Sequence, residues 1–107
     1  MGLLVSQMRL SQIINHRSDL EYKIQLVSST KLDLSSQIDE ITGLSVNFDK
    51  DSAEMKALER KKERLNAIEK ALDLKLQRYQ TQLQMINNEE QGVRQQLQES
   101  IQRSYAR

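Results

Sequence analysis

Apolar residues recur at seven-residue intervals along the first part of the chain. A second, interrupted series runs parallel to the first and contains Leu10, Ile24 and Ile38. Two such series mark the a and d positions of a coiled-coil helix. Arg17 and Lys31 occupy positions where the interrupted series should be apolar, and such residues weaken the seam but help to fix its register. The uninterrupted series consists of Ile13, Leu20, Val27, Leu34 and Ile41.

A stricter series of sevens occupies the second part of the chain, flanked by further leucines and an isoleucine. Beyond Val93 the apolar spacing changes to fours, through Leu97, Ile101 and Tyr105. A spacing of four moves the apolar stripe around the helix, so we expect a different neighbour for this segment. The series of sevens consists of Leu58, Leu65, Leu72, Tyr79, Ile86 and Val93.

Residues 42–51, between the two periodic segments, carry helix stop and start signals. Gly43 suits a left-handed C-terminal cap, and Asp51 with Glu54 forms an Asp-x-x-Glu capping box. One helix is therefore expected to end and another to begin here. An alternating apolar stretch is expected to fold over the helix tips as a plug, and it consists of Leu44, Val46 and Phe48.

These patterns predict an all-α fold in which residues 1–107 form a single antiparallel coiled-coil hairpin that assembles with other copies. The helices are expected at about 2–41 and about 52–105, and a connection this short makes an antiparallel pair. The register that keeps both series in phase also brings Lys31 close to Ile68 and Glu69. An intermolecular four-helix dimer would satisfy the same series. The expected facing pairs are Ile41 with Leu58, Leu34 with Leu65, Val27 with Leu72, Leu20 with Tyr79 and Ile13 with Ile86.

Composition agrees with long helices and excludes several functional classes. The chain has no proline, three glycines and 4% aromatic residues, as long helices do. A net charge of +1 argues against nucleic acid as a partner, and no segment is apolar and long enough for a membrane span. A single layer of paired helices buries little apolar surface, so partner chains are expected to supply part of the stability.

Charge is distributed unevenly along the hairpin. Residues 54–70 hold ten charged side chains of both signs, which is typical of a solvated face, whereas residues 1–15 hold one, Arg9. Residues 77–102 carry nine glutamines. Because neutral amides can be packed without the desolvation cost of charge, we expect the two neutral segments to pack against other copies, the alternative being a solvated helix without a partner. The expected assembly interface comprises Leu3, Leu4, Met8, Val93, Leu97, Ile101 and Tyr105.

The sequence holds no arrangement suited to catalysis. The single histidine, His16, has no nucleophile or metal ligand at a helical spacing, and the three glycines are isolated rather than grouped in a phosphate-binding loop. Cysteine is absent, which excludes disulfides and thiolate chemistry. We therefore expect no enzyme activity, no catalytic, cofactor-binding or metal-binding residues, and no small-molecule substrate.

A hairpin with apolar, amide-rich end segments resembles the needle and filament subunits of type III secretion systems and the terminal helices of flagellins. The resemblance implies that the second helix packs deep in an assembly, and the residues from Val93 through Tyr105 to Arg107 would take that part. The chain also resembles coiled-coil stalk proteins and export chaperones of the same systems. The tryptophan-containing hairpins of type VII secretion are similar in length, but this chain has no tryptophan.

Two functions follow as expectations. The first is a structural, self-assembling subunit of a filament or tubular appendage, packing through both neutral segments and exported to the cell surface by a signal-less route. The second is a cytoplasmic coiled-coil adaptor or export chaperone that binds a client helix. The charged loop end and neutral opposite end favour the first.

Overall fold

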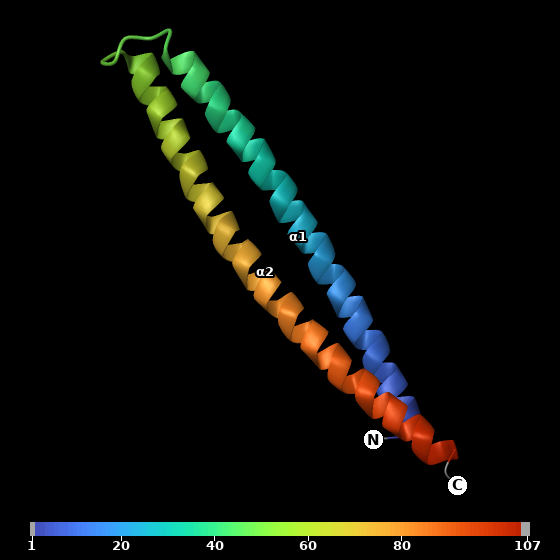
Figure 1. Cartoon of the computed structure of the whole chain (residues 1–107). Coiled ribbons are helices and arrows are strands. Elements are labelled where there is room, and N and C mark those ends of the chain that lie inside the picture. The colour runs from blue at the N-terminus through green and yellow to red at the C-terminus, as the bar shows by residue number, and fades with distance from the viewer. Residues whose placement is uncertain (1, 106–107) are drawn as a thin grey trace. The chain divides into compact units, whose positions relative to one another are not determined.

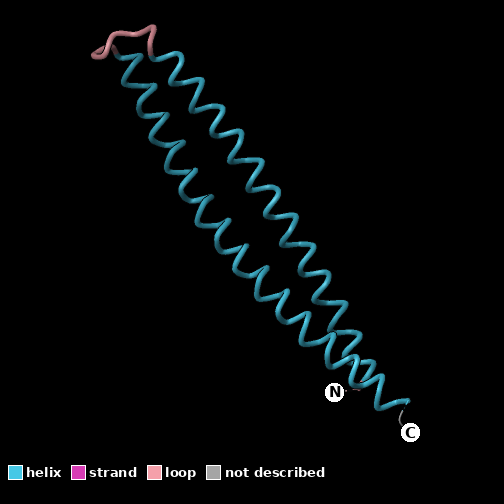
Figure 2. The backbone as a smooth tube through the Cα atoms, viewed as in Figure 1, coloured by secondary structure: helices cyan, strands magenta, loops and turns pink. Residues whose placement is uncertain are grey.

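A computed structural model describes residues 2–105 and confirms the predicted all-α hairpin. Within this range the chain forms two helices, α1 (Leu3–Ser45) and α2 (Ala53–Tyr105), and no strand. Residues 46–52 form the loop at which the chain reverses (Figures 1 and 2). The role expected for Arg107 lies outside the described residues.

Contacts within the hairpin divide the chain into two compact units. The open-end unit combines Met1–Ile24 with Arg78–Arg107, and the loop unit is Gln25–Gln77. Each unit contains a segment of α1 packed against an antiparallel segment of α2. The apolar core is accordingly described separately for each unit.

In the open-end unit the core consists of four buried residues, two from each helix. Leu20 is the most deeply buried of them, with 1% of its surface exposed. Tyr79 is half-buried and packs against this core, and the Nζ atom of Lys23 lies 6.0 Å from the centre of its ring. The buried four are Ile13, Leu20, Ile86 and Val93, and Leu10, Tyr79 and Leu83 pack against them.

Buried serines extend both heptad series of this unit. Ser6 lies seven positions before Ile13 and is fully buried, and Ser100 lies seven positions after Val93 and is 8% exposed. The predicted drift of the stripe after Val93 is therefore wrong. A search for apolar residues alone missed these serines. The seam of α2 continues at seven-residue steps beyond Val93, with Ser100 as the next buried position.

The core of the loop unit follows the same pattern. Val27, Leu34 and Ile41 of α1 are buried. Lys31 lines a groove with Glu69, as the predicted register requires, but it forms its ion pair with Asp73, also on α2. The core cluster contains Leu34, Ile41 and Leu65, and Ile38, Leu58 and Leu72 pack against it.

Helix α1 ends later than the sequence predicts. Gly43 lies inside the helix, and no glycine of the described chain has a positive φ, so the expected left-handed cap is wrong. The helix ends instead through two tight turns, in which the N–H of Asn47 donates to the Leu44 carbonyl (3.1 Å) and that of Phe48 to the Ser45 carbonyl (3.4 Å). Bonds of this i to i+3 type satisfy carbonyls at a helix end without requiring glycine.

Ser52, not Asp51, caps α2. Its hydroxyl accepts a hydrogen bond from the backbone N–H of Met55 (3.1 Å) and donates to the carbonyl of Asp49 (2.7 Å). Its own carbonyl accepts the first helical bond, from the N–H of Lys56 (3.2 Å). The predicted N-cap is therefore one residue too early, because serine and aspartate are equally good N-caps and stand side by side. With Ser52 as the N-cap, the third residue of the helix is Met55, which has no carboxylate to complete the predicted capping box.

The expected apolar plug over the helix tips does not form. Leu44 is part of α1 and 51% exposed, whereas Val46 and Phe48 lie in the loop and are 81% and 41% exposed. These side chains therefore stay in contact with solvent.

Replacing Ser52 by Ala is expected to destabilise the hairpin by about 1 kcal/mol, because the backbone N–H of Met55 at the start of α2 loses its cap. Asp51→Ala, the matched control, should change stability by less than about 0.5 kcal/mol. Urea unfolding followed by circular dichroism measures both, and equal losses would show that Asp51 shares the cap.

Truncating Leu20 to Ala should destabilise the hairpin by about 2–4 kcal/mol, because the side chain is almost fully buried and leaves a cavity. Leu32→Ala is the control, since Leu32 is 73% exposed and the same atoms are removed from solvent-exposed surface. The comparison requires the free energy of unfolding from urea titration of the wild type and both variants. Similar losses in the two variants would contradict the assigned core.

Candidate interaction surfaces

Of the ten residues predicted to form the hairpin core, seven are buried and three are half-buried. Leu58, Leu72 and Tyr79 are the half-buried ones, and each packs against a core cluster. The buried ones are Ile13, Leu20, Val27, Leu34, Ile41, Leu65 and Ile86.

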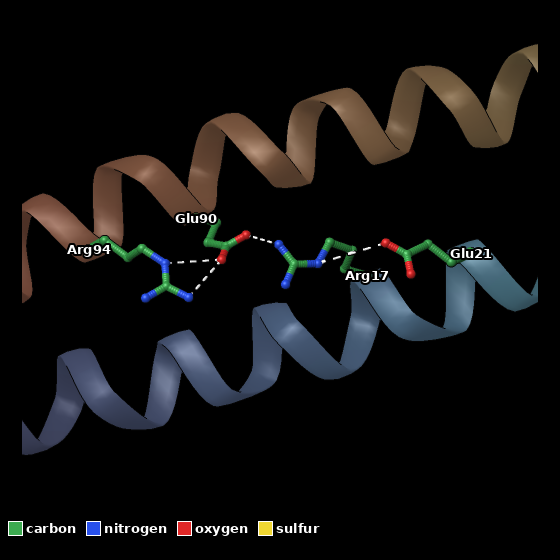
Figure 3. A network of polar contacts seen from close by, with 4 residues as sticks. All are labelled: Arg17, Glu21, Glu90 and Arg94. Atoms are coloured by element: carbon green, nitrogen blue, oxygen red, sulfur yellow. Dashed lines mark hydrogen bonds and ion pairs between the residues drawn. The ribbon is translucent and has the colours of Figure 1, made fainter.

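A network of charged residues crosses the seam of the open-end unit (Figure 3). Glu90 of α2, only 8% exposed, forms an ion pair with Arg17 of α1. Its other carboxylate oxygen accepts a hydrogen bond from Nε of Arg94 (3.0 Å) and forms an ion pair with Nη2 of the same residue (2.9 Å). Glu21 extends the network, with its Oε1 atom 3.9 Å from Nε of Arg17. A buried carboxylate is thus held between two guanidinium groups.

Because this network lies in the seam, it helps to fix the register and orientation in which the two helices pair. Arg17 belongs to the interrupted series of α1, and Glu90 stands seven residues after Leu83 and seven before Leu97 on α2. A buried ion pair adds little net stability, because desolvation offsets the attraction, but an unpaired charge there is costly. Antiparallel pairing in this register joins opposite charges, whereas a parallel pairing of two α1 segments would bring Arg17 against its own copy.

Of the residues predicted to form the assembly interface, the five at positions 3–8 and 101–105 are exposed. Val5, which was not predicted, is 52% exposed beside them. Leu4 and Met8 are four positions apart and so share one face of α1, as Ile101 and Tyr105 do on α2. We call these six residues the Leu4 surface: Leu3 (36% exposed), Leu4 (69%), Val5, Met8 (58%), Ile101 (40%) and Tyr105 (87%).

Two other predicted interface residues belong to the hairpin instead. Val93 is 3% exposed and lies in the core of the open-end unit. Leu97 is half-buried and continues the series that contains Leu83 and Glu90. Neither offers the free side chain that a partner needs, because the series of sevens holds both on the seam.

The amide-rich stretch of α2, residues 77–102, lies in the open-end unit except for its first residue, and its amide side chains are exposed. All nine glutamines of residues 77–102 are exposed, as are Asn87 and Asn88. The nearby charges Arg9 and Glu89 form an ion pair with each other, with 3.3 Å between Nη2 and Oε1. Arg103 and Glu99, on either side of Ile101, also pair with each other (3.9 Å), so the charges near the Leu4 surface are balanced locally.

The seam residues that sequence reasoning missed are polar. Ser6, Glu90 and Ser100 all lie at seven-residue steps from apolar core positions. Counting every residue in steps of seven, and not only the apolar ones, would have found all three. The hydroxyl of Ser6 is buried and, among the described residues, has no hydrogen-bond partner, a state that costs about 1–3 kcal/mol.

The described residues hold no arrangement of metal ligands, since no group of three or more His, Asp or Glu side chains converges within 2–105. His16 is exposed and lines a shallow groove with Arg9, Gln12 and Glu89. Neither α1 nor α2, over the length that the structure describes, is long and apolar enough to cross a membrane.

No protein-family model, curated protein or solved structure matches the chain. The resemblance to needle, filament and flagellin subunits therefore rests on the helical hairpin alone.

Replacing Glu90 by Gln should destabilise the hairpin by about 1–3 kcal/mol, because Arg17 then keeps a partly buried charge without its partner. The double variant Arg17→Leu, Glu90→Leu should recover most of that loss, since it removes both charges and fills the seam with apolar atoms. A double-mutant cycle on unfolding free energies, completed with Arg17→Leu and Glu90→Leu, checks the coupling. Additive losses would show that the two side chains do not depend on each other.

Proposed function

We propose that the chain is a structural subunit that assembles with copies of itself through the Leu4 surface and the neutral helix faces beside it. The observation that carries the proposal is the balance of apolar surface. Among residues 2–105, fifteen large apolar side chains are exposed and eight apolar side chains are buried. A hairpin has one seam, so further burial of apolar side chains requires helices from another molecule.

The chemistry of the Leu4 surface favours such packing. Transfer of Leu4, Val5 and Met8 from water to a helix interface stabilises an assembly by roughly 1–2 kcal/mol for each side chain. The charges nearby are paired within the hairpin, Arg9 with Glu89 and Arg103 with Glu99, so no unpaired charge among them has to be desolvated. Six exposed apolar side chains on the two helices of one unit favour an interaction site there.

A second copy is the partner that this chemistry fits best. An adaptor recognising a particular client needs charge or shape that distinguishes that client from other helices. The Leu4 surface consists of large apolar side chains on two helices and holds no charged residue that would select one client. The charged segment 54–70 belongs to the loop unit and contributes no residue to the Leu4 surface. We place such an assembly at the cell surface, as in the appendages whose subunits the chain resembles.

Purified chain is expected to form large assemblies above a threshold concentration, visible as rods or filaments by negative-stain microscopy and as fast-sedimenting species by ultracentrifugation. The variant Leu4→Asp, Met8→Asp should remain helical but fail to assemble, because carboxylates would have to be buried in the interface. Val46→Asp is the matched control, since it also places a carboxylate at an exposed apolar site, in the loop. A monomer or dimer at every concentration would support the adaptor and overturn the proposed function.

A further inference from the structure

The outward faces of the two helices in the loop unit carry opposite charge. On α1, heptad spacing aligns Leu26, Asp33 and Glu40, and Ser29 and Ser36 lie between them on the same face. All five are exposed. We call this the acidic face of α1; its charges are both negative.

The corresponding face of α2 is basic. Its exposed residues alternate at spacings of three and four, which keeps them on one side of the helix. Two are arginines, and the others are small or apolar. We call this the basic face of α2; it consists of Ala57, Arg60, Arg64, Ala67, Ala71 and Leu74.

The charges on these two faces are not used within the hairpin. In the described part of the chain, no ion pair includes Asp33, Glu40, Arg60 or Arg64. Leu26 and Leu74 are 49% and 62% exposed. Both faces are therefore free to meet a partner.

We propose that the acidic face of α1 in one copy packs along the basic face of α2 in the next copy. This inference rests on the proposed function and specifies one contact of the assembly. If neighbouring hairpins point the same way, the two helices meet antiparallel, and we place them in a register shifted by one residue, about 1.5 Å, from the one that pairs Leu34 with Leu65. The register then places Glu40 against Arg60 and Leu26 against Leu74, and Arg64 reaches Asp33 and Glu40 from one turn away.

Residue size fits this arrangement as well as charge does. Ala67 would face Asp33, and Ala71 would face Ser29, so the backbones can approach closely. Pairing two identical faces would instead bring arginine against arginine or carboxylate against carboxylate, which costs affinity. The contact therefore uses different faces on the two copies. A contact of this heterologous kind closes into a ring or continues as a helical filament.

Charge reversal tests the contact. The variants Asp33→Arg, Glu40→Arg and Arg60→Glu, Arg64→Glu should each raise the threshold concentration for assembly at least about tenfold, since like charges then face each other. An equimolar mixture of the two should assemble near the wild-type threshold, because each variant then presents the charge that the other lacks. The chain with all four reversals should also assemble alone.

Controls separate the contact from folding and from net charge. Circular dichroism should show unchanged helicity in every variant, because the four side chains form no ion pair within the described hairpin. Asp49→Arg, Asp51→Arg in the loop produces the same change in net charge as the first variant and should leave the threshold unchanged.

The outcomes distinguish this inference from the proposed function. If wild-type chain forms no assemblies, both are overturned. If the wild type assembles and the reversed variants do so at the same threshold, or if neither the mixture nor the fourfold reversal restores assembly, the lateral contact is wrong and the structural role stands. Recovery on mixing establishes the contact.

Discussion

The structure depends on one constraint, the burial of a single seam between two helices. In a hairpin each helix has only one neighbour, so only the residues at seven-residue steps leave water. Ile13 and Leu20 of α1 meet Ile86 and Val93 of α2 in the open-end unit, and Leu34 and Ile41 meet Leu65 in the loop unit. Every other face remains in solvent, whatever its composition. The exposed apolar side chains and the unpaired charges on the outer faces both follow from this geometry.

Polar residues within the seam restrict how the helices pair. The carboxylate of Glu90 lies between Arg17 and Arg94, and Lys31 reaches Asp73, so both basic residues in the seam of α1 meet acidic residues of α2. An all-apolar seam would tolerate other registers and orientations, because leucines and isoleucines are largely interchangeable as partners. Charges that must be paired make those alternatives expensive. The chain gives up some stability at these layers and gains a defined alignment.

The heptad periodicity predicted most of the fold, and local chemistry accounts for the errors. Both helices and the core positions follow from strict steps of seven, which only a helical seam explains. The boundaries were less predictable, because Gly43 tolerates an ordinary helical conformation and Asp51 and Ser52 are neighbouring candidates for one cap. Val93 was assigned to the wrong surface, since a search for apolar residues overlooks Ser100. The ion pair between Arg17 and Glu90 depends on side-chain reach across helices, which spacing along one helix does not reveal.

The loop between α1 and α2 also sets how costly each part of the seam is to close from the unfolded chain. Ile41 and Leu58 flank the loop closely in sequence, whereas Arg17 and Glu90 are 73 residues apart. Loop-closure entropy rises with the logarithm of that separation, so forming the distant contact first costs about 1 kcal/mol more than forming the near one. Once the near contacts hold, each further layer closes only a short additional stretch of chain. The entropy of the unfolded chain thus favours closing the seam in sequence from the loop outward, like a zipper.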